Sequence, residues 1–302
     1  MHVVVRRAGF AAGAIVGLLA VAGCVVYVAS QRHIARRYQV PVEALTIPTD
    51  SASIARGRHL ARAIAKCADC HGPDLSGGVF NDNVPMGHWD SQNLTRGKGG
   101  VGATFTPADW MRAIRHGVAR DGHPLTIMPA IGLRNLSTSD IGAIVAYALS
   151  LPPVDKVHAA PTFGPVARML IAQNKLPVFS AELIDHTQPP RTEAPPVGPT
   201  AEYGHYIMET GGCYACHGPT LAGGHIDVGP PDWPMAANLT PTGLKNYDLA
   251  SFTKALRTGV RPDGSKLNEV MPFAWTKEMT DDEIAGVWKF LQTIPPRAFG
   301  AR

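Results

Sequence analysis

The chain has 302 residues, of which 45% are hydrophobic and 17% charged, a composition typical of folded protein rather than of a disordered chain. The formal net charge is +4, but five of the 28 basic residues lie within the first 37 positions, leaving 23 basic against 24 acidic residues beyond them. Nucleic-acid binding draws most of its affinity from basic groups on the folded part, so this balance argues against a nucleic-acid partner.

An uncharged, apolar run occupies residues 8–29. At about 1.5 Å per residue such a helix is about 33 Å long, enough to cross a bilayer core of about 30 Å. The run is longer than the apolar part of a typical cleaved signal, and no small-residue cleavage site with a polar continuation follows it. We therefore expect residues 1–37 to form an anchor that meets the membrane through residues 8–29, with an export signal as the alternative.

Cys24 leaves one more alternative open. Residues 21–24 read Val-Ala-Gly-Cys, which resembles a bacterial lipoprotein signal in which Cys24 would be lipidated. The apolar run continues for another turn beyond Cys24, which favours a transmembrane helix, with Cys24 as a buried thiol in a lipid-facing helix. The flanking arginines do not decide the orientation, because two precede the run and three follow it.

The rest of the chain carries the same motifs twice and in the same order, which is the signature of an internal repeat. CADCHGPDLSGG at residues 67–78 recurs as CYACHGPTLAGG at residues 213–224. Three further pairs are Asn-Leu-Thr at 93–95 and 238–240, Met-Pro at 128–129 and 271–272, and an apolar residue before Pro-Pro at 151–153 and 294–296.

These repeats predict two homologous domains, at residues 45–153 and 200–298. Residues 154–199 between them hold eight prolines, which indicates a semi-rigid linker. Its less polar part, residues 163–183, is expected to pack on a domain.

Each repeat is predicted to consist of helices joined by loops, and the last helix gives the clearest signal. Its apolar positions follow the i, i+3, i+4, i+7 spacing of one buried helix face, and they are Ile141, Ile144, Val145 and Ala148 in the first repeat and Ile284, Val287, Trp288 and Leu291 in the second. Thr280 and Glu283 form a capping box that starts the second of these helices. Because no segment alternates with period two, the predicted fold class is all-α.

Each repeat contains one C-x-x-C-H motif, at Cys67, Cys70 and His71 and again at Cys213, Cys216 and His217. The two thiols of such a motif add to the two vinyl groups of one haem, while the adjacent histidine is placed beneath the iron as an axial ligand. A structural zinc site would need four ligands collected from separate domains. A thioredoxin-like pair would need a βαβ setting. The motifs therefore predict two covalently bound haem c groups, with iron as the metal.

A second axial ligand is expected some distance after each histidine, and a methionine thioether there raises the reduction potential. Met128 follows His71 by 57 residues and Met271 follows His217 by 54, and both precede proline. We therefore predict Met128 and Met271 as the distal ligands, against core packing as the ordinary use of a methionine.

The competing ligands are residues that do not recur at matching positions of the two repeats. They are Met86, His88, His116, His123 and His225. The repeated Asn-Leu-Thr segment, preceded by Trp89 in one repeat and Trp233 in the other, is expected either to contact the haem surroundings or to form a turn beside a buried aromatic.

With its C-x-x-C-H motifs, Gly-Pro turns at residues 72–73 and 218–219, Asn-Leu-Thr segments, Met-Pro pairs and closing helices, the chain resembles membrane-anchored dihaem members of the class I cytochrome c family. The tandem domains of that group serve bacterial respiratory electron transfer. Such domains are also similar to the cytochrome subunits of membrane-bound alcohol, aldehyde and gluconate dehydrogenases, which commonly carry three haem motifs where this chain has two.

The resemblance implies a protein that passes single electrons from a membrane dehydrogenase or quinol-oxidising complex to a terminal oxidase or soluble cytochrome. The cofactor then carries the redox chemistry, and no catalytic residue is expected. It also implies the cytoplasmic membrane of a bacterium, with the haem domains in the periplasm. Two alternatives stay open: a dihaem peroxidase or small-molecule oxidoreductase with one open iron, and an oxidase subunit in which one haem serves assembly.

Overall fold

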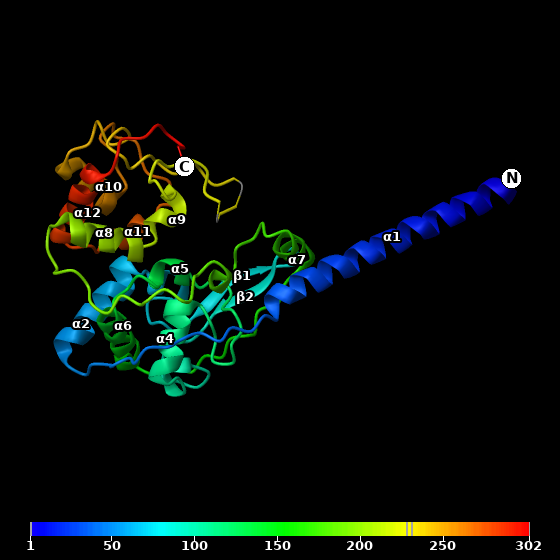
Figure 1. Ribbon diagram of the computed structural model, residues 1–302, viewed down its shortest axis with the longest axis horizontal. Coiled ribbons are helices and arrows are strands. Elements are labelled where there is room, and N and C mark those ends of the chain that lie inside the picture. The colour runs from blue at the N-terminus through cyan, green and yellow to red at the C-terminus, as the bar shows by residue number, and fades with distance from the viewer. Residues whose placement is uncertain (1, 228, 231, 302) are drawn as a thin grey trace.

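A computed structural model describes residues 2–227, 229–230 and 232–301. Positions 1, 228 and 231, which fall within the predicted anchor and second domain, lie outside the described residues, as does position 302. Helix α1 projects away from a helical body, and the first and second repeats form two adjoining parts of that body (Figure 1). The prediction of a mainly helical fold is confirmed.

Helix α1 spans His2–Ile34, and its segment Gly9–Ile34 contains an 18-residue window of mean hydropathy 2.3 in which no residue is buried by the rest of the protein. Among the described residues it is the one helix long and apolar enough to cross a membrane. Cys24 is exposed on this helix.

The first repeat folds into short helices around one two-stranded sheet. Its elements are α2 (Ser51–His59), which continues into the π-helical η1 (Leu60–Ile64), α3 (Cys67–His71), β1 (Gly78–Asn83), β2 (Gly87–Ser91), the 3-10 turn η2 (Val101–Ala103), α4 (Pro107–His116), α5 (Ala130–Leu133) and α6 (Thr138–Ser150). The second repeat contains α8 (Ala201–Thr210), α9 (Cys213–His217), α10 (Leu249–Thr258), α11 (Phe273–Thr276) and α12 (Asp281–Thr293).

The closing helices form as the sequence predicts. Thr280 caps α12, its side chain accepts from the Glu283 backbone N–H, and the Glu283 carboxylate accepts from the Thr280 N–H in return. Such a reciprocal pair satisfies two N–H groups that the first helical turn leaves without partners. The apolar stripe is buried in both α6 and α12, except that Trp288 is half-buried.

In each domain the first and last helices cross at a glycine. A Cβ on Gly57 of α2 would lie 1.8 Å from the Ala143 carbonyl oxygen of α6, and one on Gly204 of α8 would lie 2.0 Å from the Gly286 carbonyl oxygen of α12. No side chain fits into such a gap, so glycine is required for the helices to approach this closely. The crossing places the segment that precedes each C-x-x-C-H motif on the closing helix.

The hairpin β1–β2 is an addition to the predicted all-α fold. The strands are antiparallel, with Gly78 opposite Ser91 and Asn83 opposite Gly87, and the register is irregular between Val79 and Asn81. Most β1 residues are exposed, so no face of this strand is buried as a whole and its sequence has no apolar alternation. That is why the period-two criterion missed it.

The linker is folded for part of its length. It contains α7 (Pro165–Ala172) and the 3-10 turn η3 (Ser180–Glu182). A small core consists of Trp89, Ala167, Ile171, Val178 and Phe179, and thus joins β2 to the linker. The less polar part of the linker therefore packs on the first domain, as expected from its composition.

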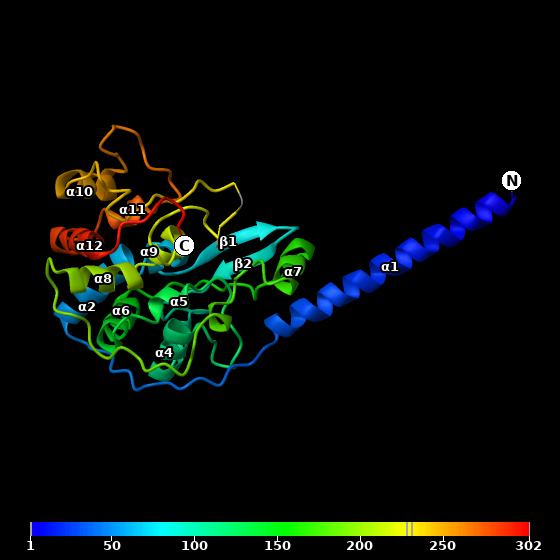
Figure 2. The same ribbon diagram turned by 45° about the horizontal axis from the view of Figure 1, so that its top comes forward.

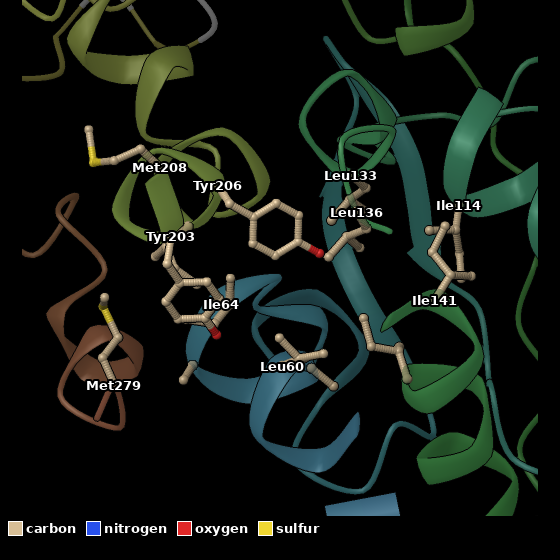
Figure 3. Close-up of a cluster of buried hydrophobic side chains, with 14 of the residues drawn as sticks. Leu60, Ile64, Ile114, Leu133, Leu136, Ile141, Tyr203, Tyr206, Met208 and Met279 are labelled. Atoms are coloured by element: carbon tan, nitrogen blue, oxygen red, sulfur yellow. The ribbon is translucent and has the colours of Figure 1, made fainter. Parts of the chain in front are cut away.

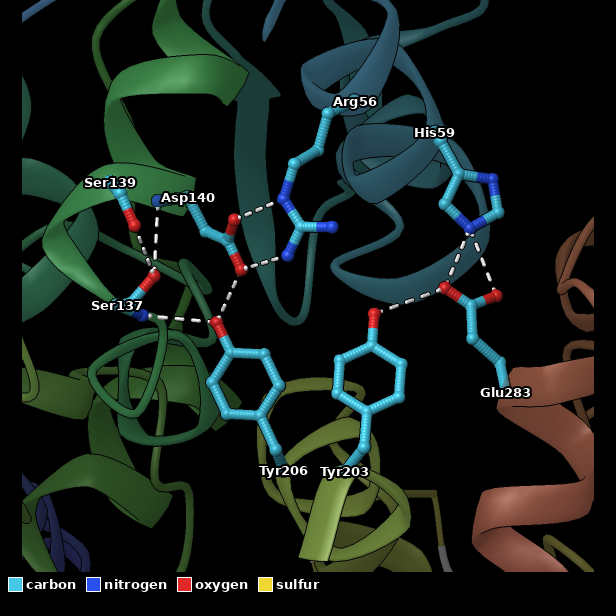
Figure 4. A network of polar contacts seen from close by, with 8 residues as sticks. All are labelled: Arg56, His59, Ser137, Ser139, Asp140, Tyr203, Tyr206 and Glu283. Atoms are coloured by element: carbon cyan, nitrogen blue, oxygen red, sulfur yellow. Dashed lines mark hydrogen bonds and ion pairs between the residues drawn. The ribbon is translucent and has the colours of Figure 1, made fainter. Parts of the chain in front are cut away.

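The two domains share one hydrophobic core. Leu60 and Ile64 of η1 lie beside Tyr203 and Tyr206 of α8, and all four are buried (Figure 3). Polar contacts cross the same boundary: the Tyr206 hydroxyl donates to Asp140 at 2.6 Å, and His59 lies 2.8 Å from the carboxylate of Glu283 (Figure 4).

Candidate cofactor-binding sites

Each C-x-x-C-H motif forms a single helical turn, α3 in the first domain and α9 in the second. Residues three and four apart in a helix share a face, so this turn places both cysteines and the histidine on neighbouring positions. The residue before each turn is left-handed, with φ of 51° at Lys66 and 71° at Gly212. The residue after each turn is a glycine with φ near 78°, a conformation that other residues rarely adopt.

Both motif histidines are held by the backbone. Nδ1 of His71 lies 2.7 Å from the Gln92 carbonyl oxygen, and Nδ1 of His217 lies 2.7 Å from that of Ala237. A carbonyl oxygen only accepts, so Nδ1–H is the donor and Nε2 carries the lone pair. Burial lowers the pKa of both imidazoles, which keeps them neutral. This is the tautomer and charge state that a metal-ligating Nε2 requires.

The Asn-Leu-Thr segments hold those carbonyl groups in place. Asn93 directly follows Gln92, accepts from the Thr95 backbone N–H at 2.9 Å and donates from Nδ2 to the Val154 carbonyl oxygen at 2.7 Å. Asn238 and Thr240 make the same contact at 2.8 Å in the second domain, and Nδ2 of Asn238 donates to the Arg297 carbonyl oxygen at 2.9 Å. The segment thus ties the acceptor of the histidine to the chain that follows the closing helix.

A cavity opens beside α3 in the first domain, with an empty volume of about 1260 Å³ that includes its mouth. Cys67, Cys70, His71 and Met128 all line it. The remaining lining is mainly apolar and comes from several elements, including Leu75, Val101, Phe105, Leu133 and Ile144. An apolar lining with a few convergent polar groups is typical of a ligand site, so the lining suits a large apolar group held at its edge by two sulfur atoms.

The thiols of both motifs are not in the state of a metal ligand. Burial raises the pKa of Cys67 to about 12 and that of Cys70 to about 11. A zinc ligand is a thiolate and is favoured by a lowered pKa. Burial also raises the pKa of Cys213 and of Cys216. The donor set of each site is therefore two neutral thiols and a neutral imidazole.

The two Met-Pro pairs have matching local structure. Pro129 and Pro272 precede α5 and α11 with φ of −80° and −78°, and the carbonyl oxygens of Met128 and Met271 accept from the N–H two residues later at 2.8 Å and 2.7 Å. Both methionines are partly buried against the shared core. The structure therefore brings Met128 into the cavity of His71 and gives Met271 the equivalent position in its own repeat.

The competing ligands lie elsewhere or have other contacts. Met86 packs on the small core around Trp89. His88 contacts Asp82 and Asp90, His116 lies 2.9 Å from His186, and His123 lies 2.6 Å from Asp121. None of these four lines the cavity, and His225, in the second domain, is exposed.

The two motif helices are neighbours, a contact that no sequence pattern indicates. Lys66, next to Cys67, donates from Nζ to the Gly211 carbonyl oxygen at 2.7 Å, two residues before Cys213. The indole N–H of Trp275, on the helix after Met271, donates to Asp69 inside the first motif at 2.7 Å. In the reverse direction, a Cβ on Gly132 of α5 would lie 3.7 Å from Cα of Gly212. Each domain's Met-Pro helix thus lies against the other domain's motif helix, and we call this contact the motif junction.

Comparison with known proteins gives two family matches. Residues 52–147 match the family described as cytochrome c oxidase, cbb3-type, subunit III, and residues 201–295 match the cytochrome c family. Each match covers one repeat and includes its C-x-x-C-H motif.

Several curated proteins are similar to the chain. It is 28% identical over 282 residues to the cytochrome c subunit of alcohol dehydrogenase (quinone) from Gluconacetobacter polyoxogenes, covering 84% of this chain and 58% of that protein. It is 35% identical over 103 residues to the fructose dehydrogenase cytochrome subunit of Gluconobacter japonicus, covering 32% and 21%. The gluconate 2-dehydrogenase cytochrome c subunit of Pantoea cypripedii is 31% identical over 103 residues, covering 32% and 23%.

The chain thus spans less than two thirds of the length of these relatives. Both repeats nevertheless match cytochrome c domains, and each carries the attachment motif on a single helical turn. The predicted family and cofactors are confirmed: the chain is a dihaem member of the cytochrome c family, with one covalently bound c-type haem in each of its two domains.

Proposed function

We propose that the protein is the electron-transfer subunit or partner of a membrane dehydrogenase, and that it passes single electrons through its two haems in succession. The carrying observation is the motif junction, at which each domain's Met-Pro helix contacts the other domain's motif helix. Electrons move between cofactors only over short distances, so attachment sites on adjoining helices support transfer within one chain.

The residue roles follow from the donor sets. Cys67 and Cys70 hold the first haem by thioether bonds, and His71 and Met128 ligate its iron. Cys213, Cys216, His217 and Met271 have the same roles at the second site. The iron supplies a one-electron couple, while the protein sets its potential through the axial ligands and through burial. The hydrogen bonds from Nδ1 to Gln92 and Ala237 orient both imidazoles.

The partners are assigned by similarity and by location. Relatives named as cytochrome subunits of alcohol, fructose and gluconate dehydrogenases support a dehydrogenase as the electron donor. A terminal oxidase or a soluble cytochrome is the acceptor, and a quinol-oxidising complex is the alternative donor. Helix α1 anchors the chain in the cytoplasmic membrane of a bacterium, with both haem domains in the periplasm.

The test of the ligand assignment is Met271→Ala in the full-length holoprotein. Both haems should stay attached, because the thioethers are untouched. The reduction potential of the second haem should fall by on the order of 0.1 V or more, since the choice of axial ligands changes haem potentials over a span of about 0.8 V. The same haem should begin to bind carbon monoxide. Met235→Ala is the control, since Met235 is 67% exposed in the same domain.

If both potentials stay unchanged in Met271→Ala, Met271 is a packing residue. If the unsubstituted protein already binds carbon monoxide or turns over peroxide, one iron is open and the peroxidase alternative applies. For the partner, the tagged chain is purified from mildly solubilised membranes together with its dehydrogenase. Addition of that enzyme's substrate should then reduce both haems, and haems that stay oxidised would contradict the proposal.

A further inference from the structure

The base of α1 is fixed to the linker helix α7 by specific contacts. The Arg168 guanidinium lies 4.5 Å from the ring centre of Tyr27 and donates to Ser30 at 3.1 Å and to Gln31 at 3.3 Å. One turn further on, His33 lies 2.9 Å from Glu182. Ser30 is fully buried by this packing. Helix α7 therefore has a set position along α1.

That position is where the uncharged run of α1 ends. The run stops at Ala29 and Arg32 is exposed, so the contact residues 27–31 span the change from apolar to charged sequence. The polar layer on each side of a bilayer core is about 5–7 Å thick, and three residues of helix rise about 4.5 Å. Tyrosine is enriched at this depth, and exposed arginines there attract anionic headgroups. In both views α7 adjoins the base of α1 (Figures 1 and 2), so an α1 that crosses the bilayer places α7 at the level of the headgroup layer.

The side of α7 that faces neither the small core nor α1 is apolar. Ala167 and Ile171 face the small core, and Arg168 faces α1. On the opposite side, Val166 and Met169 are 38% and 41% exposed and are three residues apart, so they share one face.

The turn of the β1–β2 hairpin extends this apolar surface. Val166 and Ala167 donate their backbone N–H groups to the Pro85 carbonyl oxygen at 3.0 and 3.2 Å, and Gly164 donates to that of Met86 at 3.0 Å. Val84, beside this contact, is 85% exposed. The side chains of Val84, Val166 and Met169 therefore belong to one rigid unit that is continuous with the membrane-spanning helix, and we call them the juxtamembrane patch.

We propose that the juxtamembrane patch inserts into the headgroup region of the bilayer and forms a second membrane contact beside α1. The inference rests on the proposed membrane anchoring of α1. The contact fixes the first haem domain at a set height and tilt on the membrane, because a single spanning helix is free to change its tilt in the bilayer and would carry the attached domain with it. The hairpin that carries the patch also lines the haem cavity through Trp89, so the patch sets the direction in which that cavity faces.

The experiment measures membrane depth in the full-length holoprotein, reconstituted in vesicles of phosphatidylethanolamine and phosphatidylglycerol. In a Cys24→Ser background, nitroxide labels are attached to single cysteines in Val84→Cys, Met169→Cys, Leu19→Cys and Leu249→Cys. Leu19 reports on α1, and Leu249 is a matched control that is 41% exposed on α10, far from α1 in both views. The ratio of collision rates with oxygen and with a water-soluble nickel chelate gives the depth of each label, with both haems reduced and low-spin.

The label at position 19 should read as deep in the hydrocarbon, those at 84 and 169 as headgroup depth, and that at 249 as aqueous. If 19 is deep while 84 and 169 match 249, the patch does not touch lipid and the inference is wrong, although the anchor stands. If 19 itself reads as aqueous, the anchor and the inference both fail. Low access of both reagents at 84 and 169 would indicate a protein contact and would also overturn the inference.

Discussion

Lys66 is the charged side chain that joins the two motif helices. Burial lowers the pKa of its ammonium group, and Asp69 together with the cysteines of both motifs opposes that shift. Once the cysteines are thioethers they no longer titrate, so Asp69 is the one of these groups that still opposes the shift. A buried lysine whose pKa is lowered in this way is a candidate to exchange its proton when a nearby charge changes.

The redox consequence has a definite sign. An electron added to either haem makes the proton on Lys66 more favourable, so reduction raises the pKa of Lys66. Between the pKa of Lys66 in the oxidised protein and its higher pKa in the reduced protein, the reduced protein binds more protons. Both potentials should therefore fall as pH rises through that interval.

We predict that Lys66→Gln flattens this pH dependence and lowers the low-pH potentials of both haems. A unit charge on the order of 10 Å away at an effective dielectric constant of about 20 contributes about 1.7 kcal/mol, or on the order of 70 mV. Spectroelectrochemical titration at several pH values measures this. Lys98→Gln, which removes an exposed lysine, is the control. Equal pH slopes in native protein and Lys66→Gln would show that Lys66 does not exchange a redox-linked proton.

At the residue scale, the sequence identified the local chemistry and missed the contacts between distant positions. Both C-x-x-C-H motifs, the Thr280 cap and the apolar stripes of α6 and α12 depend on residues close together in the chain, and the structure has them as predicted. The bond from Lys66 to Gly211 joins positions 145 apart. Lys66 has the left-handed backbone conformation that Gly212 has at the matching position of the second repeat. The sequence shows a lysine in place of a glycine there, but it does not show the φ angle or the contact.

At the scale of elements, α8 is the helix that joins the domains. Tyr206 is 1% exposed, donates to Asp140 at 2.6 Å and accepts the Ser137 backbone N–H at 3.0 Å at the start of α6. Arg56 binds the same Asp140 carboxylate in two places (Figure 4). Burial, followed by the Asp140 charge, raises the pKa of Tyr206 well above its ordinary value, so its hydroxyl remains a donor.

Tyr206→Phe should destabilise the holoprotein by about 1–3 kcal/mol, because it leaves a buried N–H and a buried carboxylate each short of one partner. Tyr203→Phe is the matched control on the same helix, since its hydroxyl lies 3.5 Å from Glu283 and should cost less than about 1 kcal/mol. Thermal unfolding followed by far-ultraviolet circular dichroism compares the midpoints. Equal losses for the two variants would mean that the hydroxyl of Tyr206 adds nothing to domain docking.

The elements that sequence patterns missed share a physical cause. The β1–β2 hairpin is held by its turn and by the linker rather than by a buried face, so it has no apolar alternation. Helices α5 and α11 are four residues each, too short for a helical period to show. The sequence predicted that α7 packs on a domain, because its residues are apolar, but it did not show which surface α7 contacts.

At the scale of the whole molecule, the arginines that flank the apolar run favour one orientation of α1 in the membrane, and the haem domains favour the other. Arg6 and Arg7 precede the apolar run, whereas Arg32, Arg36 and Arg37 follow it. The usual bias places the more basic flank in the cytoplasm, which would put the haem domains on the same side. A bias of one arginine is small. Arg37 donates to the Ala35 carbonyl oxygen and Arg36 lies over the ring of Tyr38, so both make contacts within their own segment.

We predict that both haem domains face the periplasm. Covalent haem attachment in the resembled bacterial family takes place on the outer side of the cytoplasmic membrane, and both motifs lie C-terminal to α1. Protease added to intact spheroplasts should therefore remove both haem-stained domains and leave a short membrane fragment that contains residues 9–29, while a cytoplasmic marker enzyme stays whole. Haem domains that resist protease until the spheroplasts are lysed would reverse the orientation. A fragment whose mass shows acyl chains on Cys24 would replace the transmembrane anchor by a lipid anchor, and the depth of α1 in the bilayer would then have to be measured again.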